Sequence, residues 1–397
     1  MAFFKNLLAP ANDYALTSWL FLKVLAVVYF IAFLSMAVQI TGLVGPSGIL
    51  PFKDVLDNFY QYHGISGWFE MPTLFWFSSS NLALHTVTIL GCVFAVILFL
   101  GHWQRLALIA LFGLYLSIYH AGQTFLNFQW DTLLLECGFL AIFLVNGPSR
   151  LLILLFHFLL FRLRFMSGVS KLVSDDPSWS GLKALNYYFE TQPLPHAGSW
   201  YFHQLPDVVL RAGTGFTFFT ELIIPFFIFL PRRFRLIAAG VTVFMQLLII
   251  ASSNHNFINL LTILLCLFLL DDKIVQRFLP QKTLPGIQSG WISSTLISLT
   301  AVSILTASLS LFYSMVSNNK VTPWLATTGL FIRSYGLGHI YHVFPTMQVE
   351  RHELQVEGSY DRVNWKAYAF KYKPGDQAER PQFIIPHQPR LDWMIWF

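Results

Sequence analysis

The chain has 397 residues, of which 55% are hydrophobic and only 11% are Asp, Glu, Lys or Arg. A soluble domain carries roughly 25% charged residues, so this composition excludes a set of soluble domains, as well as a disordered chain, a coiled coil and a disulfide-rich secreted scaffold. The net charge of +5 comes without a basic cluster interleaved with aromatic residues, so we expect no nucleic acid partner.

Long apolar runs are the main feature of the chain, because about 20 mostly apolar residues suffice for a helix to cross a bilayer. The first run is too long for the apolar part of a signal peptide, so we expect it to remain as a membrane anchor. The runs lie at residues 19–43, 82–101, 105–121, 131–146, 150–171, 213–230, 235–252, 256–270 and 291–314. They predict an all-α polytopic membrane bundle of about nine transmembrane helices within residues 1–314.

Basic residues between these runs predict the orientation of the bundle, since cytoplasmic loops carry an excess of Lys and Arg. They lie in alternate loops, at Arg105, Arg150, Arg232, Arg233, Arg235, Lys273, Arg277 and Lys282. The short loops 122–130 and 253–255 contain neither Lys nor Arg. With nine spans, the three larger segments 44–81, 172–212 and 315–397 are therefore expected on the luminal or periplasmic side.

The segment 44–81 has apolar residues at spacings of three and four, such as Phe52, Val55 and Phe59. This spacing favours a helix that lies in the membrane interface. The segment 172–212 is too polar to span a membrane, so we expect it to form an external loop.

The last segment, 315–397, changes in character. Leu354 and Val356 alternate with polar neighbours, and Tyr368 and Phe370 follow at a period of two after a turn. This alternation is typical of a β-hairpin. The pattern predicts a small C-terminal β-rich extramembrane domain over residues 315–397.

Motifs of soluble enzymes and clusters of metal ligands are absent from the sequence, so we expect no cofactor and no metal. Ionisable groups at membrane depth remain, and they are functional candidates because burying them is costly. His157, Arg164 and Lys171 stand seven residues apart, so each is displaced by only about 20° around a helix from the last. The three form an intramembrane polar stripe. It is either a structural network, with acidic partners among Asp131, Glu136 and Glu221, or part of a site.

Lys171 lies near the external mouth of the predicted bundle, where it could act as a base. Under that enzyme hypothesis, the candidate catalytic residues are Lys171, Glu221, His203 and His255. The alternatives are that Lys171 extends to the lipid headgroups, that Pro225 after Glu221 only kinks a helix, and that His255 belongs to an ordinary turn.

Aromatic residues and prolines give the loop 172–212 a stiff amphipathic surface. The surface could bind a partner, close over a site as a lid, or belong to the aromatic belt of the membrane interface. Together with residues of the tail, the candidates for partner binding are Tyr187, Tyr188, Glu190, Gln192, Trp200, Trp365, Arg390, Asp392 and Trp393.

Several of these residues lie in long ordered motifs, and with them the sequence resembles the lipase maturation factor family. The motifs include RFMSGVSKL at 164–172, NYYFETQPLP at 186–195, ELIIPF at 221–226 and PHQPRLDW at 386–393. The resemblance covers nearly the whole chain. The family's C-terminal region extends beyond the motif that ends this chain, so whether the tail is truncated stays open.

The resemblance implies a multi-pass maturation factor or chaperone that helps secreted lipases to fold and assemble. Its partners would be membrane lipid and a secreted lipase or another translocating client. Its location would be the endoplasmic reticulum membrane in a eukaryote or the inner membrane in a bacterium. A shorter match, from Ser167 to Gly181, is similar to the vitamin K-dependent gamma-carboxylase family, in which the lysine that matches Lys171 is a base. It implies the alternative function, a membrane enzyme.

Overall fold

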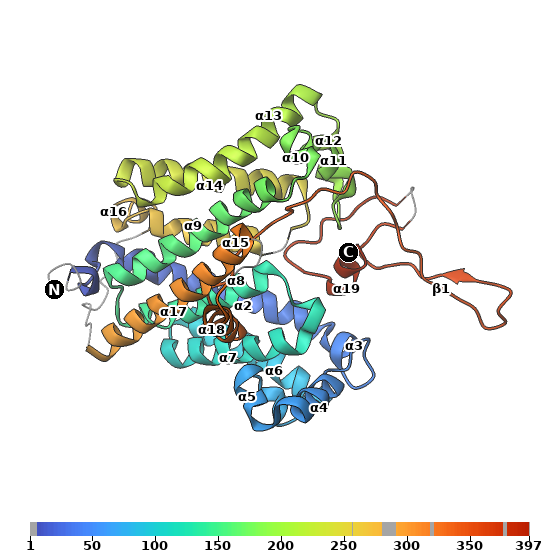
Figure 1. Ribbon diagram of the computed structural model, residues 1–397, viewed down its shortest axis with the longest axis horizontal. Coiled ribbons are helices and arrows are strands. Elements are labelled where there is room, and N and C mark those ends of the chain that lie inside the picture. The colour runs from blue at the N-terminus through green and yellow to red at the C-terminus, as the bar shows by residue number, and fades with distance from the viewer. Residues whose placement is uncertain (1–5, 256, 280–290, 318–320, 376–378, 397) are drawn as a thin grey trace.

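The helices of the bundle run mostly along the long axis of the molecule (Figure 1). The computed structural model describes residues 6–255, 257–279, 291–317, 321–375 and 379–396. Within these residues, seven helical segments are long and apolar enough to cross a membrane. They cover Asn12–Ala37, Asn81–Leu100, Gln104–Phe125, Arg150–Val173, Asp207–Phe229, Arg232–Ser252 and Ser293–Val316. The chain is therefore an integral membrane protein with a helical bundle.

Seven α-helices form the main part of these segments. They are α2 (Ala15–Ala37), α6 (Asn81–Leu100), α7 (Gln104–Gly122), α9 (Arg150–Val173), α13 (Asp207–Phe218), α14 (Arg232–Ser252) and α17 (Trp291–Val316). A 3₁₀ turn, Asn12–Tyr14, precedes α2, and another, Gln123–Phe125, follows α7. After α13 the chain continues as a π-helical turn and then as a 3₁₀ helix, η6 (Phe219–Ile223) and η7 (Ile224–Phe229).

The predicted count of nine spans is not confirmed, because two of the runs form shorter helices. The run 131–146 contains α8 (Gln129–Ala141) and a 3₁₀ turn at Leu144–Asn146. The run 256–270, whose first residue lies outside the described residues, contains α15 (Ile258–Leu265) and the 3₁₀ helix η8 (Cys266–Leu269). At 1.5 Å per residue, a helix of 13 residues such as α8 reaches only about 20 Å. Both are largely buried among longer helices, and the number of crossings stays a prediction.

Short helices occupy the segments between the long ones. Those near residues 44–81 are α3 (Ile40–Val44), α4 (Phe52–His63) and α5 (Gly67–Glu70), with 3₁₀ turns at Gly64–Ser66 and Leu74–Trp76. Those of the loop 172–212 are α10 (Pro177–Ser180), α11 (Ala184–Thr191) and α12 (Ala197–His203). Further along lie α16 (Asp272–Val275), α18 (Pro323–Ser334) and α19 (Arg390–Met394). The helix predicted around Phe52 is confirmed as α4, and its place in a membrane interface stays a prediction.

The predicted hairpin in the tail is confirmed but is short. Strand β1 (Glu357–Gly358) pairs antiparallel with β2 (Lys366–Ala367), with Glu357 opposite Ala367. It extends away from the bundle at the far right of Figure 1. Other parts of the tail return to the bundle, because Leu337, Tyr341 and Trp393 are buried in its hydrophobic core.

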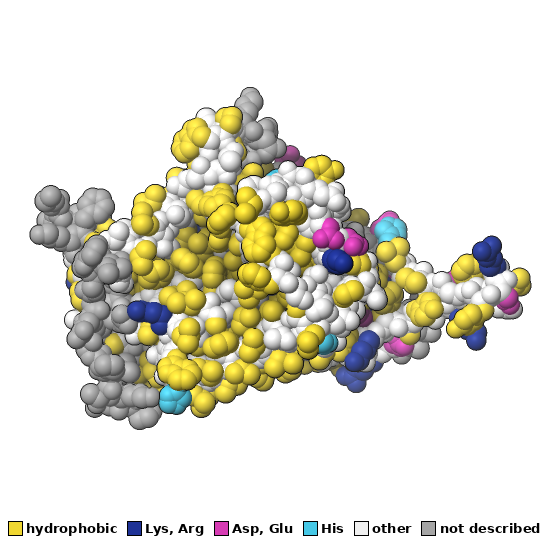
Figure 2. Space-filling view, turned by 90° about the horizontal axis from the view of Figure 1, so that it is seen from below, with side chains coloured by type: hydrophobic (Ala, Val, Ile, Leu, Met, Phe, Trp, Pro, Cys, Tyr) yellow, Lys and Arg dark blue, Asp and Glu magenta, His cyan; other side chains and the backbone are white. Residues whose placement is uncertain are grey.

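The two ends of the bundle differ in composition. At the basic end, defined here by residues 6–14, 148–150, 231–235 and 271–277, Arg150 N–H donates to the Ala9 carbonyl and Arg232 pairs with Asp271. At the tail end, defined by residues 172–206, 337–351 and 382–396, the Arg351 guanidinium donates to the Gln192 carbonyl at 2.6 Å. Figure 2 shows a broad hydrophobic surface along the bundle, with many of the visible charged side chains at the tail end. This distribution suits a bundle with its sides in lipid.

Candidate functional site

Lys171 lies in a buried cluster of ionisable groups between α9 and η6. Its Nζ is 2.9 Å from Oε2 of Glu221 and donates to the carbonyls of Val343 at 2.8 Å and Ser167 at 3.2 Å. The ammonium also lies over the ring of Trp179, 5.0 Å from its centroid, which adds a cation–π attraction. Lys171 is only 4% exposed, so it does not extend to the membrane surface as one interpretation held.

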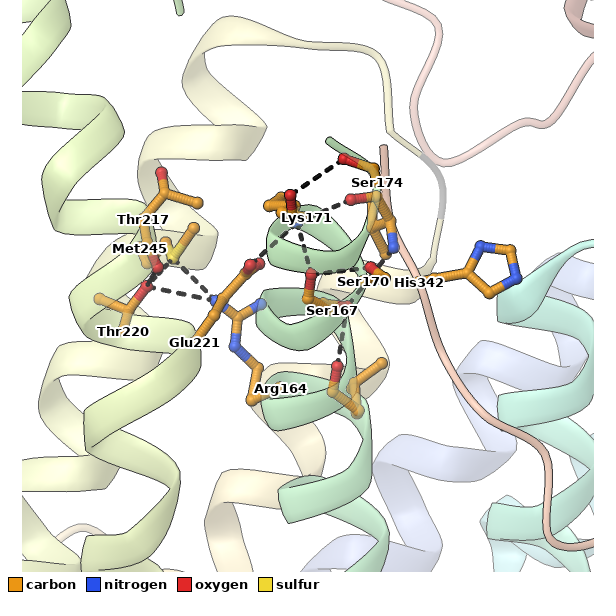
Figure 3. Close-up of polar contacts among 12 residues, drawn as sticks. Arg164, Ser167, Ser170, Lys171, Ser174, Thr217, Thr220, Glu221, Met245 and His342 are labelled. Atoms are coloured by element: carbon orange, nitrogen blue, oxygen red, sulfur yellow. Dashed lines mark hydrogen bonds and ion pairs between the residues drawn. The ribbon is translucent and has the colours of Figure 1, made fainter. Parts of the chain in front are cut away.

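Arg164 lies one seven-residue step before Lys171 on α9 and faces the same carboxylate. Its NH2 is 3.5 Å from Oε1 of Glu221 and 2.9 Å from the sulfur of Met245, and it donates to the Thr220 hydroxyl at 3.4 Å. Figure 3 shows Glu221 between the two basic side chains. Of the predicted acidic partners, Glu221 therefore serves both cations.

Two local features bring Glu221 to this position. Pro225 cannot donate a backbone hydrogen bond, and the helix before it widens into the π-helical turn that carries Glu221. Gly168 on α9 lets this turn approach, because a Cβ there would lie 2.7 Å from a methyl group of Leu222 and 3.0 Å from Cβ of Glu221. The predicted kink is thus a widened turn that exposes a carboxylate to α9.

The cluster lines a cavity of about 100 Å³ that opens between α9, η6, α14 and α15. Lys171, Glu221 and His255 all line it, so three of the four candidate catalytic residues come together. The fourth, His203, does not line it and lies 3.6 Å from Glu190 at the protein surface. The remaining walls are mostly apolar, with contributions from Leu163, Leu185, Ile249, Ile258, Val343, Phe344 and Met347.

His255 lies at the tail-end side of this cavity. Its Nε2 is 2.6 Å from the hydroxyl of Tyr188, which also lies 2.7 Å from the hydroxyl of Ser253. Burial lowers the pKa of His255 to about 4 and raises the pKa of Tyr188 well above its usual range. Both side chains are therefore neutral near pH 7 and tie loop 253–255 to α11.

Only Arg164 and Lys171 of the predicted polar stripe lie in the cluster around Glu221. His157 lies away from the cluster, where its Nε2 is 2.7 Å from the carbonyl oxygen of Phe268. Arg162, on another face of α9, pairs with Glu136 of α8, whose second oxygen accepts from the Gly338 backbone at 2.9 Å. His157 therefore contacts a backbone carbonyl away from the cluster, and its role stays a prediction.

Asp131 has a partner that the spacing of the spans did not indicate. NH1 and NH2 of Arg390 donate to its two carboxylate oxygens at 2.7 Å each. Arg390 was predicted to bind a partner protein, yet it is 1% exposed and belongs to the interior.

The other candidates for partner binding divide by exposure. Trp200 is 62% and Trp365 is 57% exposed, and Glu190 is also accessible. Tyr187 is half-buried. The remaining candidates are buried, namely Tyr188, Gln192, Asp392 and Trp393. In this structure only the exposed members can contact a partner directly.

Polar residues of the cavity that the sequence pattern did not single out come from α14 and α15. Nδ2 of Asn259 donates to Oε1 of Gln246 at 2.8 Å, and both side chains are 2% exposed. Both amides lie within apolar runs, and this pattern could have identified the two residues as candidates for a functional site. Trp179, Val343, Phe344 and Met347 complete the wall, and their approach depends on the tertiary fold.

Comparisons with known proteins match most of the chain. Residues 16–277 match the lipase maturation factor transmembrane domain, and residues 337–397 match the lipase maturation factor C-terminal domain. Lipase maturation factor 2 of Xenopus laevis is 32% identical, over 97% of this chain and 71% of the relative. Lipase maturation factor 1 of Homo sapiens is 31% identical, over 98% of this chain and 76% of the relative. No solved structure shows significant similarity.

Proposed function

This chain belongs to the lipase maturation factor family, and we propose that it helps secreted lipases to fold and assemble while anchored in a membrane. The observation that carries the proposal is the match of both family domains, together with more than 30% identity to curated maturation factors over nearly the whole chain. The relatives are named for lipase maturation, so the alternative of a membrane enzyme with Lys171 as its base is not favoured.

The exposed aromatic side chains of the tail end are the surface we propose for the client. Trp200 and Tyr201 project from α12, and Trp365 and Tyr368 are exposed around the hairpin. A folding client presents unburied apolar segments, and exposed aromatic residues bind such segments with large contact areas. Glu190 adds an acidic group 3.6 Å from His203 of α12.

Co-expression with a secreted lipase tests this proposal. Trp200→Ala and Trp365→Ala together should reduce both co-purification of the lipase and secreted lipase activity by at least about tenfold, since the loss of one hot spot costs about 2 kcal/mol or more. The matched control is Trp103→Ala, an exposed tryptophan in the loop between α6 and α7, near the basic end. Equal loss in the control, or an unchanged double variant, would contradict the proposed surface.

We also propose that the tail end faces the lumen of the endoplasmic reticulum in a eukaryotic cell, or the periplasm in a bacterium. The support is the concentration of loop Arg and Lys residues at the basic end, which favours the cytoplasmic side for that end. A client that is being secreted would meet only the opposite end.

Labelling with a membrane-impermeant maleimide tests the orientation in sealed vesicles. Val363→Cys in the exposed hairpin should react only from the luminal or periplasmic side, and Arg277→Cys after α16 only from the cytoplasmic side. The native cysteines provide a low background, because Cys137 and Cys266 are buried and Cys92 is half-buried. Reaction of both variants from the same side would refute the orientation.

A further inference from the structure

The cavity beside Lys171 contains polar hydrogens that have no acceptor. Among the residues that the structure describes, Nε of Arg164, Nε2 of Gln246 and Nε1 of Trp179 are buried without a hydrogen-bond partner. All three side chains line the cavity, and each residue is less than a tenth exposed. Oδ1 of Asn259, which also lines the cavity, is a buried acceptor without a hydrogen-bond partner. Buried polar groups are nearly always paired, so this excess of unpaired donors over unpaired acceptors indicates a missing group that mainly accepts hydrogen bonds.

The unpaired amide donor is present whichever way the two amide groups are oriented. The contact between Asn259 and Gln246 uses one amide nitrogen and one amide oxygen. Reversing both amides would leave the unpaired nitrogen on Asn259 in place of Gln246, and both residues line the cavity. A donor therefore faces this space in either arrangement.

Basic residues outnumber acidic residues around the cavity. Arg164 and Lys171 are basic, and Glu221 is the single acidic residue among the described lining residues. His255 and Tyr188 also line the cavity and are neutral near pH 7. The basic residues therefore outnumber the acidic residue by one, and a buried basic group without a counter-charge is costly. The missing acceptor is therefore expected to be an anion.

The size and the walls of the cavity limit which anion can enter. The volume of about 100 Å³ is smaller than the roughly 150 Å³ of a cavity that holds one benzene molecule, so it suits a small head group. A carboxylate fits this size, whereas a phosphodiester headgroup with its glycerol exceeds it. The mostly apolar walls favour a ligand whose charged head continues into a hydrocarbon chain.

A second cavity of about 520 Å³ adjoins the first and shares His255, Ile258, Val343 and Phe344 with it. Its walls are rich in aromatic residues, including Phe128, Trp130 and Trp393. A hydrocarbon chain that starts at the charged cluster would thus find a larger aromatic space directly next to it.

We propose that this pair of cavities binds a long-chain fatty acid, with its carboxylate held by Arg164, Trp179 and the amide of Gln246 or Asn259. Its alkyl chain passes Val343 and Phe344 into the larger cavity. Lys171 and Glu221 remain paired and set the local charge. The site lies in the bundle and is separate from the client surface proposed above, so either proposal can fail alone.

Equilibrium binding of radiolabelled palmitate to the detergent-purified full chain tests this site, with competition by unlabelled palmitate, 1-hexadecanol and hexadecyl phosphate. Saturable binding is expected, with palmitate competing at least about tenfold better than 1-hexadecanol, because only the acid forms charge-assisted hydrogen bonds. Equal competition by the alcohol would overturn the proposal. Stronger competition by hexadecyl phosphate would also overturn it, in favour of a phosphorylated lipid.

Two variants locate the binding. Arg164→Gln should weaken palmitate binding by about tenfold or more, since it removes the excess charge but leaves the pair of Lys171 and Glu221 intact. Trp179→Phe keeps a ring near Lys171 and removes only the indole N–H, so it should weaken binding several-fold without unfolding the protein. Arg235→Gln, at the basic end, is the matched control. Wild-type affinity in Trp179→Phe, together with wild-type affinity or misfolding of Arg164→Gln, would refute the site.

Discussion

Arg390 and Asp131 form a buried bidentate ion pair that joins the tail of the chain to α8. The two hydrogen bonds are 2.7 Å long, and the side chains are 1% and 0% exposed. The Tyr115 hydroxyl donates to the same carboxylate at 2.6 Å. The partners are 259 residues apart in sequence, so this contact fixes the last helix against the bundle.

Arg390→Met should destabilise the protein by about 3–5 kcal/mol, because it leaves the Asp131 carboxylate buried without a counter-charge. Adding Asp131→Asn should restore much of the loss, since Asn keeps an acceptor for Tyr115 and removes the stranded charge. Thermal unfolding in one detergent measures both variants. Arg362→Met, in the exposed hairpin, is the control. A double variant as unstable as Arg390→Met would show that the charge is not the cause.

Glu221→Gln should destabilise the protein more than Lys171→Met does. Removing Glu221 leaves two buried cations near each other, whereas removing Lys171 leaves Arg164 and Glu221 as a neutral pair. The expected difference in the free energy of unfolding is about 2 kcal/mol or more, within the range for a buried charge without a partner. Unfolding temperatures of the two variants decide the order, with exposed Glu350→Gln as the control. The reverse order would mean that Arg164 does not share the carboxylate.

Gly168→Ala should disturb the contact between α9 and η6. The added methyl group would meet Leu222 at 2.7 Å, closer than carbon atoms approach, so the π-helical turn must move away. We expect a loss of about 1–3 kcal/mol from overpacking. Gly215→Ala in α13 is the matched control, because its Cβ would enter open space and the change should be neutral or slightly stabilising. Equal stability of both variants would argue against the close approach.

The protein should become less stable as the pH is lowered from about 6.5 to 4, because His255 is buried in its neutral form. Burial lowers its pKa to about 4, while the unfolded chain has the ordinary value near 6.5, so the unfolded state binds more protons in this window. The contribution of His255 to the free energy of unfolding is fully present above pH 6.5 and falls by about 3 kcal/mol towards pH 4. His255→Asn should flatten the pH dependence of the unfolding temperature relative to wild type. The same change at exposed His352 should not, and an unaltered slope in His255→Asn would contradict this assignment.

Part of the site could be predicted because buried charge has a simple requirement. Ionised groups inside a membrane need partners, and this requirement singles out Asp131, Glu136 and Glu221 from the sequence alone. The pairing itself could not be predicted from spacing. Glu221 reaches two cations through a π-helical turn, and Asp131 pairs with Arg390 from the tail. Burial also removed Tyr188 and Trp393 from the predicted partner surface.

The sequence by itself determined that the chain lies in a membrane, that it belongs with the lipase maturation factors, and where its long helices lie. Hydropathy is a property of contiguous residues, so it can be evaluated from the sequence without knowledge of the fold. The tertiary structure alone decided which runs form full-length spans, which charges pair, and that Arg164, Trp179 and Gln246 surround one cavity with unpaired donors. Those outcomes depend on packing between residues far apart in the chain, and no local pattern contains that information.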